Sequence, residues 1–283
     1  MSIAPAQTSP DVVDGPDSPT GERIRLSDLS EIHERGALAL VGCGAAKRDP
    51  TDEADLHEAS IGPDESFGPD WTDETGPAWK ARDLYTSNYF HLKRQFAERI
   101  AGVENARKGA SPWGILSAKH HVLMPWKDVK YYEKSIKDIG DDETNPDHRV
   151  ENPHGLRRPD GREIVTEMDQ WARLVAFGLM KWIASFRPIR GAPNTTNAKT
   201  LFVLAGQDYI NPLRDKGVFE YGISRMAGDP NQVSDFPLHV RFLFEEFEND
   251  GIGDQMSWLS DAVDRLDEPA APTEQATIEG WSP

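Results

Sequence analysis

Residues 37–48 read ALALVGCGAAKR, an apolar run followed by two glycines and two basic side chains. The run is short and bounded, and it lacks the strict alternation of a strand with one wet face. This pattern is typical of a strand buried on both faces of a parallel sheet. Trp113–Ser117 and Thr200–Ala205 have the same character. Three such runs predict a mainly parallel central sheet.

Helical patterns separate the three predicted strands. Thr86 is a candidate cap for a helix that carries Phe90, Phe96 and Ile100 and ends at Ala101-Gly102. Residues 162–186 place apolar side chains on one stripe before Pro188, and residues 255–266 form a third amphipathic segment. Strands that alternate with helices predict an α/β fold in which helices flank the sheet.

The remaining segments are polar, and we expect one α/β domain over residues 36–266 between two disordered ends, 1–35 and 267–283. Residues 49–78 are interpreted as an acidic loop insertion whose prolines break any regular element. Residues 138–161 are interpreted as a long loop, either a lid or binding element or a plain surface connection.

The chain has 283 residues and a formal charge of −17, with 48 acidic and 31 basic side chains. This balance excludes a generic basic clamp for nucleic acid. A salt-loving proteome would also give such acidity, so a nucleic-acid substrate is not excluded. A single cysteine, Cys43, excludes internal disulfides and cysteine-cluster zinc sites. No apolar run approaches the roughly 20 residues of a membrane span, and no signal sequence is visible. We therefore expect a cytoplasmic protein with no membrane partner.

Ligands of open α/β sheets bind outside the carboxyl ends of the strands, so the residues that follow each run are candidates. After the first run, Gly42, Cys43 and Gly44 allow a sharp turn with exposed amides, and Lys47 can complete a cradle for a phosphate or carboxylate. No Walker motif is present. The alternative is a tight turn with surface basic residues, in which Cys43 serves packing rather than catalysis.

The second and third runs also end in polar residues. Ser117, Lys119 and His120 can bind an anion and supply a general acid or base, although a histidine at a strand end often serves only structure. Gly206 permits close approach of a ligand, and Tyr209 either stacks on a flat ring or donates its hydroxyl. A tyrosine in this position can equally be a half-buried packing residue.

Two further motifs lie outside the strand ends. Asp83 is either a catalytic carboxylate, with Tyr85 as a wall of the site, or half of a surface ion pair with Arg82. Gln255 follows a glycine turn that begins a helix, whose amino end can receive an anion. The alternative is a plain turn beside a core tryptophan. Histidines and carboxylates are too scattered to nominate a metal site, and no cofactor is expected.

Taken in order, these motifs resemble a domain-of-unknown-function family from phages, bacteria and archaea that is distantly similar to the peroxide-stress protein YaaA. The resemblance covers roughly residues 37–266 without the acidic insertion. It implies an α/β fold and a link to DNA protection or nucleic-acid modification. His121 stands where the family usually has glycine, and the tyrosine expected after Pro125 is either Tyr131 or Tyr132.

The first functional hypothesis is an enzyme that cleaves or exchanges the glycosidic bond of a nucleotide or of a base within nucleic acid. Lys47 and Lys119 would bind phosphate, Tyr85 or Tyr209 the base, and Asp83 and His120 would assist displacement at the sugar carbon.

The second hypothesis is a non-enzymatic stress protein that binds nucleic acid through five lysines with interleaved aromatic residues: Lys119, Lys127, Lys130, Lys134 and Lys137, with Trp126, Tyr131 and Tyr132. An ordinary amphipathic segment with inward aromatic side chains fits the same residues. The third hypothesis is a nucleotide sensor encoded in a defence operon.

Overall fold

The structure is a computed structural model that describes seven stretches of the chain: 24–48, 57–61, 74–102, 110–186, 198–220, 238–247 and 251–268. Side chains are not described for residues 57–61, 74–77 and 246–247. Most of the expected leader (1–23), of the acidic insertion (49–56 and 62–73) and of the tail (269–283) lies outside the described residues.

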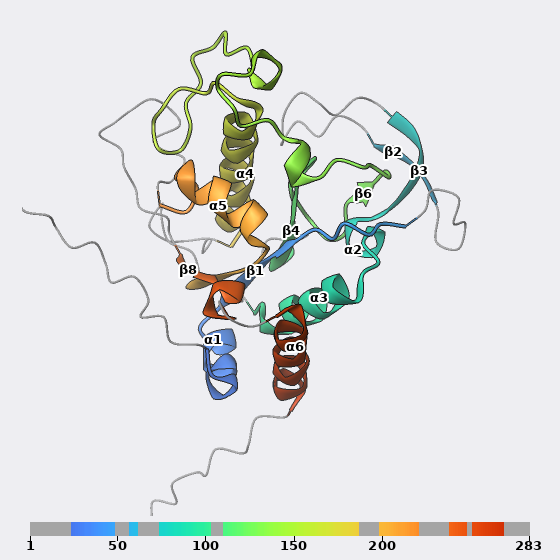
Figure 1. Cartoon of the computed structure of the whole chain (residues 1–283). Helices are drawn as coiled ribbons and strands as arrows, with labels where there is room; N and C mark the ends of the chain where they lie inside the picture. The colour runs from blue at the N-terminus through green and yellow to red at the C-terminus, as the bar shows by residue number, and fades with distance from the viewer. Residues whose placement is uncertain are drawn as a thin grey trace, which may run out of the picture.

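The centre of the fold is a five-stranded sheet in the order β5-β4-β1-β7-β8 (Figure 1). Its strands are β1 (Ala37–Gly42), β4 (Trp113–Ser117), β5 (His121–Leu123), β7 (Thr200–Leu204) and β8 (His239–Phe242). Four strands are parallel, and β5 runs antiparallel to β4 at the edge. The mainly parallel sheet predicted from the sequence is confirmed, although β5 and β8 were not predicted.

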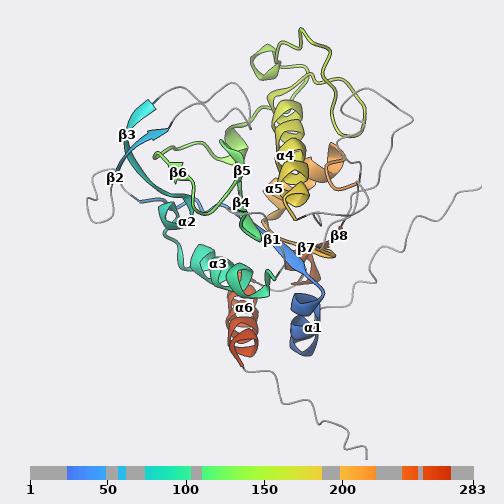
Figure 2. The same cartoon turned by 180° about the vertical axis from the view of Figure 1, so that it is seen from behind.

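Helices cover both faces of the sheet, as Figures 1 and 2 show. On one face lie α1 (Leu29–Glu34), α3 (Asn88–Ile100) and α6 (Ile252–Asp267), and on the other α4 (Glu167–Ala184) and α5 (Gln207–Asp215). Alternate residues of β1 divide between two cores: Val41 packs with α3 and α6, and Leu40 with α4 and α5. The strand is apolar throughout because both of its faces are buried.

Three predicted helix starts are corrected. Ser87, not Thr86, caps α3, because its hydroxyl accepts a hydrogen bond from the Phe90 amide at 3.2 Å. Thr166 caps α4, so this helix begins at residue 167 rather than 162. The last helix, α6, begins at Ile252, three residues before Gln255.

The two polar segments that the structure describes in part contain regular elements. Residues 26–34 are helical and Leu29 is fully buried, so the fold begins earlier than the expected residue 36. Within the expected insertion, β2 (His57–Ile61) pairs with β3 (Glu74–Lys80), which continues to β6 (Asp128–Val129) in a second sheet. The prediction that prolines prevent regular structure here is wrong. Pro77 lies opposite Glu58 of β2, beyond the short pairing of Trp79 and Lys80 with β6.

Short elements complete the described part of the chain: α2 (Ala81–Leu84) and the 3-10 helices Leu26–Asp28, Ile136–Asp138, Pro146–His148 and Leu243–Phe247. Residues 139–161, all of them described, contain no α-helix or strand beyond the turn at Pro146–His148. None of the helices that the structure describes is both long and apolar enough to cross a bilayer.

Candidate functional site

The strand ends that the sequence singled out meet at one edge of the sheet. Parallel pairing brings the carboxyl ends of β1, β4 and β7 together, and α2 and the segment after β6 close around them. We call the side chains gathered there the edge cluster: Cys43, Lys47, Tyr85, Ser117, Lys119, His120, Tyr132 and Tyr209.

Buried hydroxyl groups form the inner layer of the edge cluster. The Tyr132 Oη atom lies 2.6 Å from the Tyr85 Oη atom and 2.9 Å from the Ser117 Oγ atom. Ser117 Oγ also accepts the amides of Lys119 and His120, at 3.2 and 3.0 Å. Because this oxygen already accepts two hydrogen bonds, its own hydrogen is left to donate to Tyr132. Of the two tyrosines that follow Pro125 at a short distance, Tyr132 is therefore the one that lies in the edge cluster.

Two ammonium groups converge on the ring of Tyr132. The Lys47 Nζ atom lies 4.6 Å from the ring centroid and the Lys119 Nζ atom 5.7 Å from it. Backbone bonds fix the loop that carries Lys47, since the Thr86 amide donates to the Ala46 carbonyl and the Arg48 amide to Leu84. Lys47 is half-buried and Lys119 is exposed, so both charges are open to a ligand.

Cys43 and Tyr209 form the partly exposed rim of the edge cluster. The Cys43 sulfur lies 3.0 Å from the Tyr209 hydroxyl, and the Trp171 ring packs against Tyr209 with centroids 6.0 Å apart. Burial first, and then the nearby Cys43, raise the pKa of Tyr209 and of Tyr132. Both hydroxyls hold their protons at neutral pH, so they act as hydrogen-bond donors rather than as bases.

His120 is buried with its ring edge-on to Tyr132, the centroids 5.0 Å apart. Burial, followed by the charges of Lys119 and His121, lowers the pKa of His120 to about 3. The imidazole is therefore neutral at pH 7, which argues against the acid role expected from the sequence. The neighbouring His121 has a φ of 59°, a left-handed conformation that favours glycine over other residues.

Asp83 is not brought into the edge cluster. Its carboxylate binds Arg94 at 3.0 Å and Arg82 at 3.4 Å, on the outer side of α3. At Asp83 the structure therefore shows the surface ion pair rather than the catalytic carboxylate. Tyr85 is fully buried, so it offers its hydroxyl to Tyr132 and no open face to a base.

The predicted glycines separate into packing and open positions. A Cβ atom at Gly42 would lie 2.9 Å from the Ala205 Cβ atom, so glycine is needed there for the close approach of β1 and β7. A Cβ atom at Gly44 would lie 3.2 Å from the Ser87 hydroxyl. Gly206 faces open space at the amino end of α5, so of these positions it is the one accessible to a ligand.

Lys93 and Tyr89 of α3 are polar neighbours of the cluster that the sequence reasoning missed. The Lys93 Nζ atom donates to the Gly42 carbonyl at 2.9 Å and lies 4.8 Å from the Tyr89 ring centroid. The Tyr89 hydroxyl donates to Gln255 at 2.5 Å, so the predicted Gln255 is joined to these neighbours of the cluster. The signal was a lysine on the apolar stripe of a helix, between Phe90 and Phe96.

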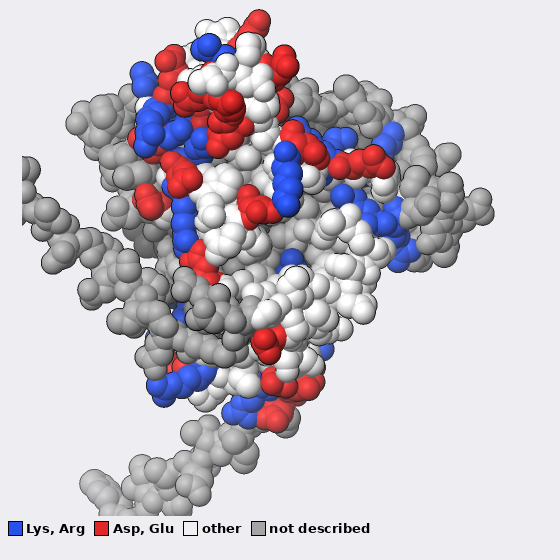
Figure 3. Space-filling view, viewed as in Figure 1, with Lys and Arg blue, Asp and Glu red and all other residues white. Residues whose placement is uncertain are grey.

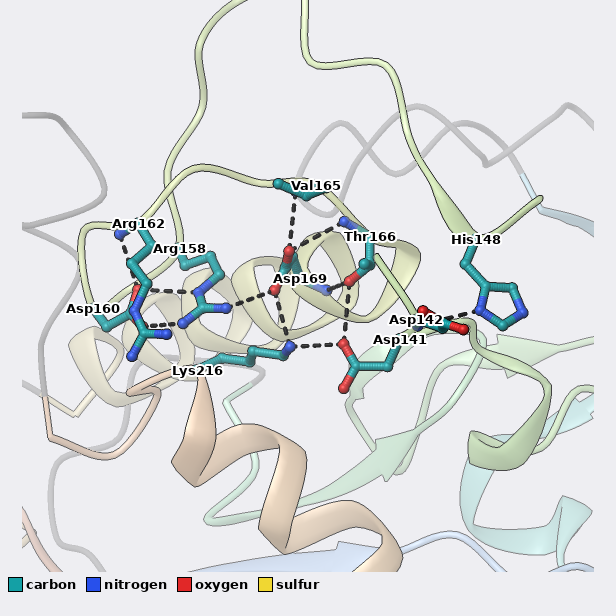
Figure 4. Close-up of polar contacts among 10 residues, drawn as sticks. All are labelled: Asp141, Asp142, His148, Arg158, Asp160, Arg162, Val165, Thr166, Asp169 and Lys216. Carbon is teal, nitrogen blue, oxygen red and sulfur yellow. Dashed lines mark hydrogen bonds and ion pairs between the residues drawn. The ribbon is translucent and has the colours of Figure 1, made fainter. Parts of the chain in front are cut away.

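A second polar cluster, which we call the loop clamp, holds residues 139–166 against the fold (Figure 4). Its members are Asp141, Arg158, Asp160, Asp169 and Lys216. Asp169 of α4 accepts hydrogen bonds from Arg158 at 3.0 Å and lies 3.1 Å from the Lys216 Nζ atom. Lys216, at the end of α5, also binds Asp141 at 2.7 Å. The clamp thus joins the loop to the helix that carries Tyr209.

Among the residues that the structure describes, no group of three histidine, cysteine or acidic side chains is placed to hold a metal ion.

Comparison with known proteins gives one match, over part of the chain. No curated protein and no solved structure matches the sequence. The matching stretch begins with β3 and includes Tyr85, Lys93, Ser117, His120 and Tyr132, whereas Cys43, Lys47 and Tyr209 lie outside it. Over residues 74–150 the chain is similar to a family of unknown function (DUF6884).

Proposed function

We propose that the chain is an enzyme that binds a nucleotide, free or within a nucleic acid, at the edge cluster and cleaves or exchanges its glycosidic bond. The observation that carries this proposal is the convergence of Lys47 and Lys119, from the loops after two different strands, on the ring of Tyr132. Two cations at the carboxyl edge of a parallel sheet suit a phosphate group.

The cluster supplies hydrogen-bond donors for the remainder of a nucleotide. Tyr209 is half-buried and its hydroxyl is protonated, and Gly206, three residues before it, leaves open space for a ligand. As the glycosidic bond breaks, water or an incoming base bonds to the sugar carbon, and the departing base carries negative charge until it takes up the proton that this nucleophile releases. With Asp83 turned away from the site, Tyr209 would stabilise that base through a fixed donor aimed at the developing charge.

The resemblance to the YaaA-like family supports the same direction, since it implies DNA protection or nucleic-acid modification. A nucleotide sensor and a non-enzymatic stress protein would use the same contacts without turnover. Measured base release therefore distinguishes the enzyme from both alternatives.

The binding test is a Lys47→Ala, Lys119→Ala double variant titrated with nucleoside 5′-monophosphates by calorimetry. We expect at least about tenfold weaker binding, because each ammonium supplies a charge-assisted contact to the phosphate. Lys181→Ala is the matched control. It removes the same charge from the last turn of α4, which lies at the opposite edge of the sheet, where Trp182 bonds the Ser111 carbonyl that precedes β4. Equal affinity in the double variant and the control would contradict the proposal.

The turnover test follows free base by chromatography with nucleotides and DNA as substrates. Tyr209→Phe is expected to slow base release by about tenfold with little change in nucleotide affinity, because it removes one donor to the departing base. Asp83→Asn is expected to react like the wild type, since Arg82 and Arg94 already bind its carboxylate. No base release by the wild type would leave a binding protein, and a large loss in Asp83→Asn would restore the carboxylate mechanism.

A further inference from the structure

The segment that follows β5 presents aromatic side chains on both sides. Tyr132 is 5% exposed and belongs to the edge cluster, whereas Trp126 is 47% and Tyr131 36% exposed. The inward packing of all three aromatic residues, which the sequence left open, is therefore not what the structure shows. We call the outward residues and their basic neighbours the outer strip: Trp126, Lys127, Lys130, Tyr131 and Lys134.

The outer strip is fixed to the rest of the fold. The amides of Ala81 and Arg82, which begin α2, donate to the carbonyls of Lys127 and Pro125 at 2.7 and 3.0 Å. Between these aromatic residues, β6 pairs with β3. The backbone that carries the two exposed rings is thus held in place before any ligand binds, which lowers the entropic cost of binding.

Positive charge gathers around the same region in an otherwise acidic chain. Segments 43–48, 78–94 and 117–138 together contain eleven Lys or Arg and four Asp or Glu, against 31 and 48 in the whole chain. Figure 3 shows basic side chains on the part of this face that carries α2. A local basic area on a protein of net charge −17 favours a polyanion at this place over nonspecific binding elsewhere.

We infer that the substrate is a single-stranded nucleic acid, of which one nucleotide occupies the edge cluster while neighbouring bases stack on Trp126 and Tyr131. The inference rests on the proposed function and names its substrate class. The adjacency of Tyr131 and Tyr132 carries it, because one ring faces the cluster and the next faces outward along the strip. Stacking on exposed rings requires unpaired bases, and the lysines of the strip meet the backbone phosphates.

The experiment measures fluorescence anisotropy of a labelled oligothymidylate of about 12 nucleotides, a length within the range of single-strand sites. The variants are Trp126→Ala, Tyr131→Ala and, as a conservative pair, Trp126→Phe, Tyr131→Phe. Phe177→Ala is the control, because it removes an aromatic side chain of similar exposure, 42%, from α4. We expect the alanine pair to bind the oligonucleotide at least about tenfold more weakly, and the phenylalanine pair and the control to bind like the wild type.

Two further probes separate this inference from the proposed function. Thymidine 5′-monophosphate should bind the alanine pair as it binds the wild type, since a mononucleotide reaches only the edge cluster. A duplex of the same length should bind more weakly than the single strand. Unchanged oligonucleotide affinity in the alanine pair, or equal affinity for the duplex, would overturn the inference while leaving binding of the monophosphate intact. Loss of monophosphate binding in the Lys47, Lys119 variant remains the test of the site itself.

Discussion

Replacing Asp169 with alanine is expected to lower the free energy of unfolding by about 3–5 kcal/mol, the cost of removing one partner from a buried ion pair. The Asp169 side chain is 1% exposed, and the guanidinium and ammonium groups that it binds are 5% and 10% exposed. Both cations would remain buried with less negative charge beside them. Asp160 and Asp141 would still bind them, so the loss falls within this range rather than above it.

Asp169 also stabilises the first turn of α4. Its second carboxylate oxygen accepts the amides of Val165 and Thr166 at 3.0 and 3.1 Å, while the Thr166 hydroxyl accepts the Asp169 amide. This reciprocal arrangement satisfies backbone donors that the first turn of α4 leaves unpaired. Asp169→Asn keeps an oxygen for the amides but loses the charge, so we expect it to be less destabilising than alanine.

The same residue predicts how stability depends on pH. Burial raises the pKa of Asp169, but the backbone amides of Val165 and Thr166 and the charge of Lys216 outweigh this, so the net pKa is lowered. An acid whose folded pKa lies below its unfolded value binds fewer protons when folded. Its contribution to stability is therefore present above the unfolded value near 4 and is lost as the pH falls below it. Asp169→Asn should lose less stability than the wild type on acidification.

Urea unfolding of the wild type and the variants at neutral and acidic pH measures both effects. Asp142→Ala is the control, because Asp142 belongs to the same loop but its carboxylate accepts hydrogen bonds from the exposed Thr144 rather than from the buried cations of the loop clamp. We expect its stability to match the wild type. An Asp169→Ala protein as stable as the wild type would show that the loop clamp does not hold the loop.

The central sheet could be predicted because burial on both faces removes the polar positions of a strand. Residues 37–42 and 113–117 therefore read as apolar runs, and the structure confirms both boundaries. The edge strands β5 and β8 were missed because they are three and four residues long and polar in part, with His121, His239 and Arg241 among them. Short edge strands form because the neighbouring strand is already in place, and local sequence does not encode that neighbour.

The candidate site, like the sheet, could be predicted only in part. Lys47, Ser117, Lys119 and Tyr209 were predicted together because topology alone places residues that follow parallel strands at one edge. Lys93 was missed as a neighbour of the cluster, and Tyr132 could not be told apart from Tyr131, because a helix and a loop deliver these side chains and their direction depends on packing. The direction of Asp83 also depends on packing: it lies two residues from Tyr85, yet in α2 its carboxylate turns toward Arg94 while the Tyr85 hydroxyl turns inward.

Replacing Lys93 with methionine is expected to remove a rise in stability at alkaline pH. Burial lowers the pKa of Lys93 to about 8, although the nearby Cys43 partly opposes this. A basic group whose folded pKa lies below its unfolded value of about 10.5 binds fewer protons when folded between these two values. The unfolding free energy of the wild type should therefore increase by about 3 kcal/mol relative to Lys93→Met between pH 8 and pH 10.5, at about 1.4 kcal/mol for each pKa unit.

Taking the difference between the two proteins is necessary because the tyrosines titrate in the opposite sense. Burial raises the pKa of Tyr85, Tyr132 and Tyr209, so the unfolded chain loses these protons first and both proteins become less stable above about pH 10. This loss of stability is common to the two proteins and cancels in the difference.

Making both proteins in a Cys43→Ala background removes the thiol that faces Lys93, and Lys181→Met serves as an exposed lysine control. A difference that stays constant with pH would show that the Lys93 ammonium is as well solvated in the fold as in water. A rising difference would mean that a charged side chain is kept at the end of β1 at a cost in neutral-pH stability, which is the behaviour of a residue that serves the site rather than the core.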